Sequence, residues 1–350
     1  MLTCLQRAGT RAALCLCSLG LAANVAACAG QATPTPVPPK PATAPAVAIS
    51  PSPAASPSPS QSPAAAGLSM GAFAVLIDNN SDARPQSGLD AADVVYEAPT
   101  EGGIPRLMAL YLRDTQVERI GPVRSARQYF VYLAAEYHVA LAHISGSPQG
   151  LAALDETGLP RLDEARGDGG FTRDPSRQAP HDAYVSTQAV RSELARAGTR
   201  VSATTAGLSF GAFRPGPQPA TRLRIGYGAD RFSAQYDYDG GARAYQRSQD
   251  DQPHTDAPSG RRYAPRSVIV QQVTVQPIPN DDAGRVDLGL VGTGRGLLVA
   301  EGTQVPLQWA KGNLSEATRF SRTDGMPFSV PEGQVWIELV PTDGQVDVSG

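Results

Sequence analysis

The stretch VVYEAPTEGGIPRLMALY, residues 94–111, covers nearly all of two short apolar runs of strand length, 93–97 and 107–112, which are separated by Gly and Pro. Similar runs lie at 72–78 and 139–145, and apolar residues recur with helical spacing at 122–137, 147–156 and 186–197. Strand-length runs mixed with helical patterns predict an α/β layer arrangement for this part of the chain.

The pattern changes from about residue 221. Alternating or β-branched runs, divided by Gly, Pro and Asp turns, occupy 222–227, 232–238, 267–275, 285–290, 296–300 and 335–340. The stretch GTGRG at 292–296 lacks the strand-to-helix setting of a phosphate-binding loop and predicts a β turn. We therefore expect an α+β protein, with an α/β domain at 67–216 followed by a mainly β domain at 217–350.

The first 28 residues have the features of an export signal. Arg7 and Arg11 precede the apolar run 12–27, which is short for a membrane span and ends in small residues before Cys28. Small residues directly before a cysteine resemble a bacterial lipobox, which implies that Cys28 is lipidated and anchors the protein to the membrane. An ordinary cleaved signal with a coincidental cysteine is the alternative.

Residues 29–66 are almost entirely Ala, Pro, Ser and Thr and predict an extended, disordered linker. The cysteines are Cys4, Cys15, Cys17 and Cys28, so the mature domain has no cysteine for a disulfide, a zinc site or a nucleophile. The net charge of −3, without a basic block, argues against nucleic acid as a partner. His254 and Asp256 lack a third ligand, so the sequence predicts no metal site, and it indicates no cofactor.

Several motifs carry a family resemblance. They are VVYEAPTEGGIPRLMALY at 94–111, GPVRSAR at 121–127, HISGSP at 143–148, FTRDPSRQAPHDAYVS at 171–186, YDYDGGARAYQR at 236–247, HTD at 254–256, RSVIVQ at 266–271 and WIELVP at 336–341. Their order and content resemble the YerB-like lipoproteins, a bacterial family defined by a domain of unknown function. The resemblance implies an exported, lipid-anchored protein with two domains, and it supplies no reaction.

Polar side chains gather at the expected strand ends and loops, where α/β proteins present ligands. If these loops converge, they form one polar cleft. The candidate ligand-binding residues are Arg84, Arg106, Arg124, Arg127, His143, Arg173 and Arg177, and the candidate catalytic residues are Glu101 and His181. In the alternative interpretation the arginines form salt bridges with Asp78, Glu97, Glu101 or Asp163 that brace the loops, and His143 is a core residue.

Arg124 and Arg127 are of special interest because the pattern GPVRSARQYF predicts a helix that begins near Pro122. A helix N-terminus carries partial positive charge, so two arginines there are unfavourable unless an anion lies between them. The sequence therefore predicts an anion site, with an internal carboxylate as the competing source of negative charge.

Two functions follow from these residues. The first is the binding of an anionic cell-wall or envelope ligand, such as peptidoglycan, through arginines. The second is cleavage of a wall glycan by a hydrolase or lyase reaction, with Glu101 or Glu97 as general acid or base. Carboxylates that are each paired with an arginine would favour binding. In both cases the protein acts outside the cytoplasmic membrane.

Overall fold

The structure is a computed structural model that describes residues 67–228 and 234–350. The expected signal peptide at 1–28, with Cys28, and the expected linker at 29–66 lie outside the described residues. All described residues belong to a single compact unit. Among them, no helix has both the length and the apolar composition needed to span a bilayer.

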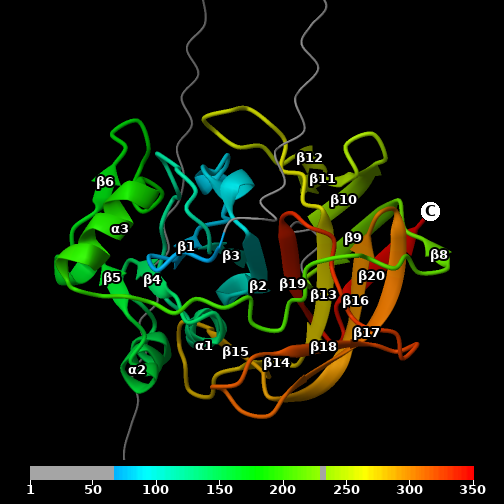
Figure 1. The fold of residues 1–350 in the computed structure, drawn as a ribbon. Coiled ribbons are helices and arrows are strands. Elements are labelled where there is room, and N and C mark those ends of the chain that lie inside the picture. The colour runs from blue at the N-terminus through cyan, green and yellow to red at the C-terminus, as the bar shows by residue number, and fades with distance from the viewer. Residues whose placement is uncertain (1–66, 229–233) are drawn as a thin grey trace, which may run out of the picture. The chain divides into compact units, whose positions relative to one another are not determined.

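The three α-helices described lie before residue 200, and most of the described strands lie after it (Figure 1). The helices are α1 (Gln128–Glu136), α2 (Pro148–Thr157) and α3 (Thr187–Arg196). The strands before residue 200 are β1 (Phe73–Ile77), β2 (Val94–Pro99), β3 (Pro105–Tyr111), β4 (Ala140–His143), β5 (Arg161–Asp163), β6 (Phe171–Arg173) and β7 (Ala183–Val185).

The later strands are longer on average and follow one another through turns. They are β8 (Gln218–Pro219), β9 (Arg222–Gly226), β10 (Ala234–Asp239), β11 (Ala244–Gln249), β12 (Gln252–Pro253), β13 (Ser267–Val273), β14 (Val275–Pro277), β15 (Val286–Leu288), β16 (Gly292–Ala300), β17 (Thr303–Lys311), β18 (Arg319–Arg322), β19 (Val335–Pro341) and β20 (Gln345–Ser349). This arrangement confirms the predicted fold class, α+β with a mainly β C-terminal region.

One large sheet runs across the expected domain boundary. Its strand order is β18-β17-β16-β13-β19-β2-β3-β1-β4-β5, and β8 pairs with β17. At its centre β19 lies parallel to β2, so that Val335 faces Val94 and Glu338 faces Glu97. Residues from before and after position 216 therefore share one sheet and one hydrophobic core.

Burial explains why the central strands read as continuous apolar runs. Every residue of β1, β2, β3 and β19 is buried, whereas β9 and β17 alternate between buried and exposed positions. A strand that is covered on both faces cannot place polar side chains in water on either. The few polar residues within the central strands, such as Glu97 and Glu338, must therefore find partners inside the protein.

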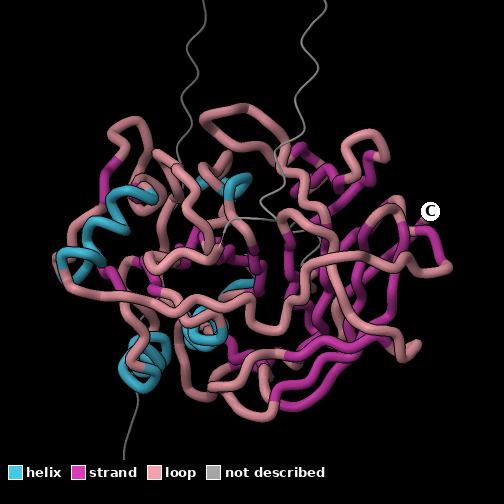
Figure 2. The backbone as a smooth tube through the Cα atoms, viewed as in Figure 1, coloured by secondary structure: helices cyan, strands magenta, loops and turns pink. Residues whose placement is uncertain are grey.

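A second sheet, of order β12-β11-β10-β9-β20, packs on the C-terminal part of the large sheet. Tyr236 of β10 meets Trp336 of β19 edge-on, with ring centroids 6.3 Å apart, and the guanidinium of Arg247 on β11 lies 4.5 Å from the centroid of the Trp336 ring. Figure 2 shows the helices on one side of the molecule and the strands of the C-terminal region on the other. The two sheets thus enclose a core that contains charged side chains.

The helix that was expected to begin near Pro122 begins instead at Gln128. Residues 122–126 are extended, because Val123 forms a bridge to Ile77 of β1 and the Arg124 N–H donates to the Leu76 carbonyl. Arg127 is the N-cap residue, with a backbone in the β region. The prediction was wrong because pairing with β1 overrides the local helical pattern, and Arg124 consequently lies outside the helix.

The GTGRG stretch is also not a turn but the beginning of β16. Gly294 makes room for a neighbouring ring, since a Cβ at this position would lie only 2.4 Å from Nε1 of Trp309. The Trp309 indole crosses β16 and donates to the Gln272 carbonyl at 2.9 Å. Glycine here permits close packing rather than a sharp bend.

Candidate functional site

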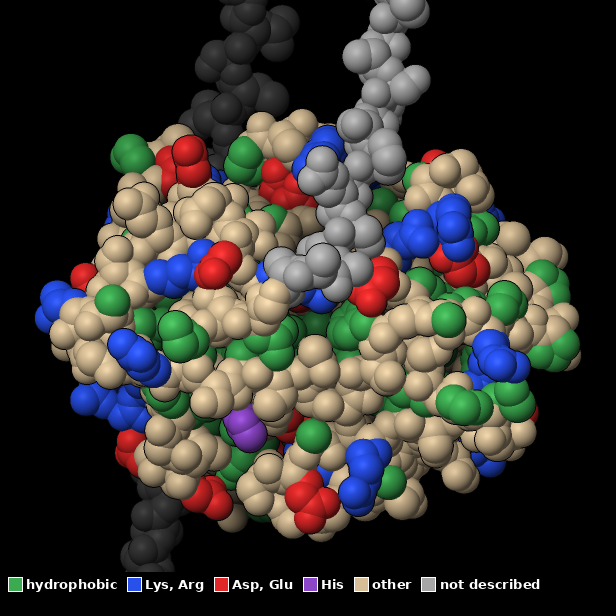
Figure 3. Space-filling model, in the orientation of Figure 1, with side chains coloured by type: hydrophobic (Ala, Val, Ile, Leu, Met, Phe, Trp, Pro, Cys, Tyr) green, Lys and Arg blue, Asp and Glu red, His purple; other side chains and the backbone are tan. Residues whose placement is uncertain are grey.

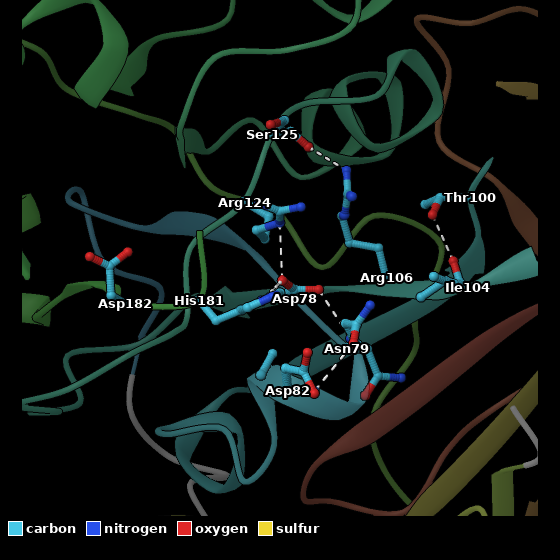
Figure 4. A network of polar contacts seen from close by, with 12 residues as sticks. Asp78, Asn79, Asp82, Thr100, Ile104, Arg106, Arg124, Ser125, His181 and Asp182 are labelled. Atoms are coloured by element: carbon cyan, nitrogen blue, oxygen red, sulfur yellow. Dashed lines mark hydrogen bonds and ion pairs between the residues drawn. The ribbon is translucent and has the colours of Figure 1, made fainter. Parts of the chain in front are cut away.

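Asp78 is placed directly after β1, where the strand leaves the sheet. Its N–H donates to the Pro122 carbonyl, which fixes the backbone against the segment that carries Arg124. Its Oδ2 accepts a hydrogen bond from His181 Nδ1 at 2.7 Å and lies 3.0 Å from Arg124 Nε. Asp78 is almost fully buried, whereas the side chains of Arg124 and His181 are 25% and 17% exposed, so the group borders solvent (Figure 4).

Three arginines gather beside Asp78. We call Arg106, Arg124 and Arg127, together with Asp78 and Glu101, the arginine cluster. Arg106 comes from β3 and donates from Nη1 to the carbonyl of Ser125, the residue between Arg124 and Ala126, at 2.9 Å (Figure 4). The cluster has three positive and two negative side chains.

The charges of the cluster act on one another. Burial and the neighbouring charge of Arg127 lower the pKa of Arg106 to about 10, so its guanidinium is still charged at neutral pH. Its Nη2 lies 3.9 Å from Glu101 Oε1, which is a weak ion pair. Arg106 is thus held near other cations without a close carboxylate of its own.

Arg127 and Glu101 form the tightest pair of the cluster. Arg127 donates from Nε to Glu101 Oε2 at 2.9 Å and from Nη2 to Oε1, while its Nη1 donates to the Ala126 carbonyl. Burial by itself would raise the pKa of Glu101, but the hydrogen bond and charge of Arg127 outweigh it and lower this pKa to about 2. Glu101 is therefore an ionised partner of Arg127 at neutral pH.

Arg124 is less completely paired. Its Nε is buried and, although it lies 3.0 Å from Asp78, it has no aligned hydrogen-bond acceptor. Its terminal nitrogens also have no hydrogen-bond partner within residues 67–228 and 234–350. Several donors of a partly exposed guanidinium are consequently free to bind another acceptor.

The remaining predicted residues are distributed around the cluster with other partners. Arg84 donates to Asp250 at 2.8 Å, Arg173 bridges Glu164 and Asp182, and Arg177 donates to the carbonyls of Ala83 and Pro85. These contacts tie loops together. The structure thus brings together Arg106, Arg124, Arg127, Glu101 and His181, but not Arg84, Arg173 or Arg177.

His143, at the end of β4, is fully buried. Its Nδ1 lies 2.8 Å from the Ser145 carbonyl and 3.9 Å from Asp163, and its Nε2 has no partner within the described ranges. Burial lowers the pKa of His143, so the neutral ring is favoured.

Sequence reasoning missed a buried polar network behind the cluster. Glu97 accepts from Asn79 at 3.0 Å and from Arg247 of β11, while Glu338 accepts from the hydroxyls of Tyr227 and Tyr236. Burial raises the pKa of Glu97 to about 8; Arg247 opposes this shift and the charge of Glu338 adds to it. Two carboxyl groups that share one arginine favour retention of a proton on the pair.

His254 and Asp256 belong to the same interior and have structural partners. Arg247 donates to Nδ1 of His254, and Nε2 of the same ring donates to Gln86 at 2.7 Å, so the ring is a neutral tautomer. Burial and the charge of Arg247 hold the pKa of His254 well below the usual range. Asp256 accepts from the Gly88 N–H at 2.7 Å. Within the described part of the chain, no group of three or more His, Cys, Asp or Glu side chains could hold a metal ion.

Charged side chains are mixed over the visible surface. On the face drawn in Figure 3, Lys and Arg lie beside Asp and Glu and form no continuous basic patch. The positive excess of the arginine cluster is therefore a local feature.

Comparisons with known proteins agree with this architecture. Residues 61–200 match the family model "Protein of unknown function (DUF3048) N-terminal domain", and residues 223–337 match the corresponding C-terminal domain. The chain is 32% identical over 272 residues to "Putative lipoprotein YerB" of Bacillus subtilis (strain 168), covering 77% of this chain and 80% of that protein.

A solved structure is similar as well. The crystal structure of the YerB protein from Bacillus subtilis matches with a TM-score of 0.68 and 29% sequence identity, over 79% of this chain and 93% of that one. The sequence match, the two consecutive domain matches and the fold agree with the resemblance seen in the motifs. The chain belongs to the DUF3048 family, whose members include YerB-like proteins.

Proposed function

We propose that this protein is an exported envelope protein, anchored through a lipid on Cys28 and a linker at 29–66, whose arginine cluster binds an anionic envelope ligand. The name of its relative as a lipoprotein supports the anchoring. The composition of the cluster supports the ligand: three arginines meet two carboxylates beside solvent, and Arg124 has unused donors.

The excess of positive charge is the observation that carries the proposal. Arg106, Arg124 and Arg127 repel one another, and Asp78 and Glu101 compensate only part of this repulsion. A carboxylate or phosphate that approaches Arg124 would complete the charge balance and form charge-assisted hydrogen bonds. Peptidoglycan carries carboxylates and is one ligand of this class.

Glycan cleavage by Glu101 is less well supported. A general acid must hold a proton at working pH, but Glu101, with a pKa of about 2, is ionised and paired with Arg127. Pairing of both Asp78 and Glu101 with arginines is the arrangement that favours binding.

The proposal can be tested by thermal unfolding of the full chain in detergent, with and without soluble muropeptides or inorganic phosphate. A ligand that binds the folded state raises the unfolding free energy by RT ln(1 + [L]/Kd), or about 2.7 kcal/mol at one hundred times Kd. We expect the melting temperature of the wild type to rise with ligand concentration. For Arg124→Gln, the apparent Kd obtained from the same titration should be at least tenfold higher.

A matched control is Arg222→Gln. Arg222 is an exposed arginine of β9 that pairs with an aspartate, Asp237, as Arg124 pairs with Asp78. This variant should keep the wild-type response. Equal responses of Arg124→Gln and the wild type, or no response to any anion, would refute binding at the cluster.

A further inference from the structure

The contact between Asp78 and His181 orients a base. Because the Asp78 carboxylate only accepts hydrogen bonds, the His181 Nδ1 must carry the hydrogen in their 2.7 Å contact. Whenever this ring carries one hydrogen, its lone pair is on Nε2, which has no hydrogen-bond partner among the residues that the structure describes. An imidazole held by a carboxylate, with its other nitrogen free, is the usual arrangement of a general base.

The same carboxylate links the base to the cations. Asp78 Oδ2 contacts both His181 Nδ1 and Arg124 Nε, so imidazole and guanidinium diverge from a single oxygen. Figure 4 shows His181, Arg124 and Arg106 around Asp78. Asp78 is thus the common partner of the candidate base, His181, and of the guanidinium that would hold an anion, Arg124.

We propose that His181 is a general base that activates water for hydrolysis of a phosphodiester bound at the arginine cluster. This inference rests on the proposed function and specifies its ligand. The three arginines and two carboxylates of the cluster sum to a net charge of +1, which matches the single negative charge of a phosphodiester.

The reaction balances without an oxidant or a reductant. The water oxygen attacks phosphorus while the water proton passes to His181 Nε2, and the bond from phosphorus to one ester oxygen breaks with its electron pair. The imidazolium then returns the proton to the departing oxygen. The products are a phosphomonoester and an alcohol.

The charges of the phosphoryl group and of His181 change together in this step. As hydroxide adds to phosphorus, the phosphoryl group gains one negative charge, and His181 gains one positive charge from the proton. Asp78 stabilises the imidazolium through Nδ1, and Arg124 and Arg106 are placed to stabilise the phosphoryl oxygens. The site therefore interacts more strongly with the transition state than with the bound ester.

The test uses the full chain in detergent with EDTA and three probes: bis(4-nitrophenyl) phosphate, glycerophosphoglycerol and vesicles of phosphatidylglycerol. The first reports phosphodiester cleavage in general, and the other two distinguish a soluble ester from a lipid head group. We expect 4-nitrophenolate release that falls at least 100-fold in kcat for His181→Asn, with KM within about twofold, because general-base catalysis typically contributes 10²–10⁴-fold. Asparagine retains a donor toward Asp78.

His138→Asn is the matched control, since His138 is an exposed histidine at the end of α1 with φ of 53°, a conformation that asparagine tolerates. It should cleave at the wild-type rate, and equal loss in both variants would overturn the assignment of His181. No cleavage of any probe by a wild type that still shows anion-dependent thermal stabilisation would refute the hydrolysis and leave the binding function standing. Absence of both effects would refute both.

Discussion

Glu97 and Glu338 lie directly opposite each other on the neighbouring parallel strands β2 and β19, and both are fully buried. Glu97 lies in the region that matches the N-terminal family domain, and Glu338 lies on β19, near the end of the chain. Arg247 of the second sheet binds Glu97, so this single cation lies at the junction of both regions. The charge state of this pair therefore affects the contact between the N-terminal and C-terminal regions of the chain.

The carboxyl pair should make stability depend on pH. Burial raises the pKa of Glu97 from an ordinary 4.5 to about 8. Between these values the folded protein holds a proton that the unfolded chain has released, so the free energy of unfolding falls as pH rises from about 4.5 to 8. Glu338→Gln leaves Glu97 alone with Arg247, and we expect this fall to become smaller. Urea denaturation at pH 5.5 and 8 measures it.

The control for this experiment is Asp155→Asn, which removes a largely exposed carboxylate paired with Arg161. The control should show the same change of unfolding free energy between the two pH values as the wild type. If Glu338→Gln does so too, the carboxyl pair does not hold the proton.

Arg247→Gln should be among the most destabilising substitutions of an arginine in this protein. Arg247 is fully buried and donates to Glu97, Tyr236 and His254. Its removal leaves a buried carboxyl pair without a cation, which typically costs about 3–5 kcal/mol. Urea denaturation near pH 7 measures the loss, and the exposed Arg222→Gln should change stability by only about 0.5 kcal/mol. A loss below about 1 kcal/mol for Arg247→Gln would contradict this account.

The fold class could be predicted because central strands that are buried on both faces leave continuous apolar runs in the sequence. The buried network could not be predicted, because Arg247 is 150 positions from Glu97 in the sequence and an arginine normally faces water. The start of α1 was also not predictable, since residues 122–126 have a helical pattern but Val123 bridges to Ile77 of β1 and Ala126 to Gly146.

For the candidate site, the sequence identified the polar residues at loop and strand ends but not how they pair. The arrangement of Arg127 with Glu101, and of Arg124 with Asp78, depends on how β1, β3 and the segment before α1 meet in space. The role of Asp78 as the common partner of His181 and Arg124 has no local signal in the sequence.

Cys28→Ala should release the protein from the membrane. The motivation is the cysteine after small residues and the lipoprotein name of the relative. Fractionation of cells followed by mass spectrometry should show the wild type in the membrane fraction with the mass of a lipid added. If the variant stays in the membrane fraction, the cysteine is not the anchor. Ser18→Ala, within the apolar run, should leave the protein anchored.

The pair of Arg127 and Glu101 should contribute more stability than a surface ion pair. Arg127 is 8% exposed, and its contact with Glu101 involves two nitrogens and both carboxylate oxygens. Because Glu101 itself is 29% exposed, water partly replaces a lost partner, and we expect a coupling energy of about 1 kcal/mol. A double-mutant cycle of Arg127→Gln and Glu101→Gln, followed by urea denaturation at pH 7, measures it.

The same cycle at low pH checks the electrostatic origin of this coupling. Arg127 lowers the pKa of Glu101 from 4.5 to about 2, so the stabilisation is complete above about pH 4.5 and is lost as pH falls toward 2. The reference is the i,i+3 pair Arg196 and Glu193 on α3, in which the arginine is 72% exposed, with an expected coupling of about 0.3–0.5 kcal/mol. A coupling for Arg127 and Glu101 no larger than this reference, or one that does not fall below pH 4.5, would show that these residues act separately.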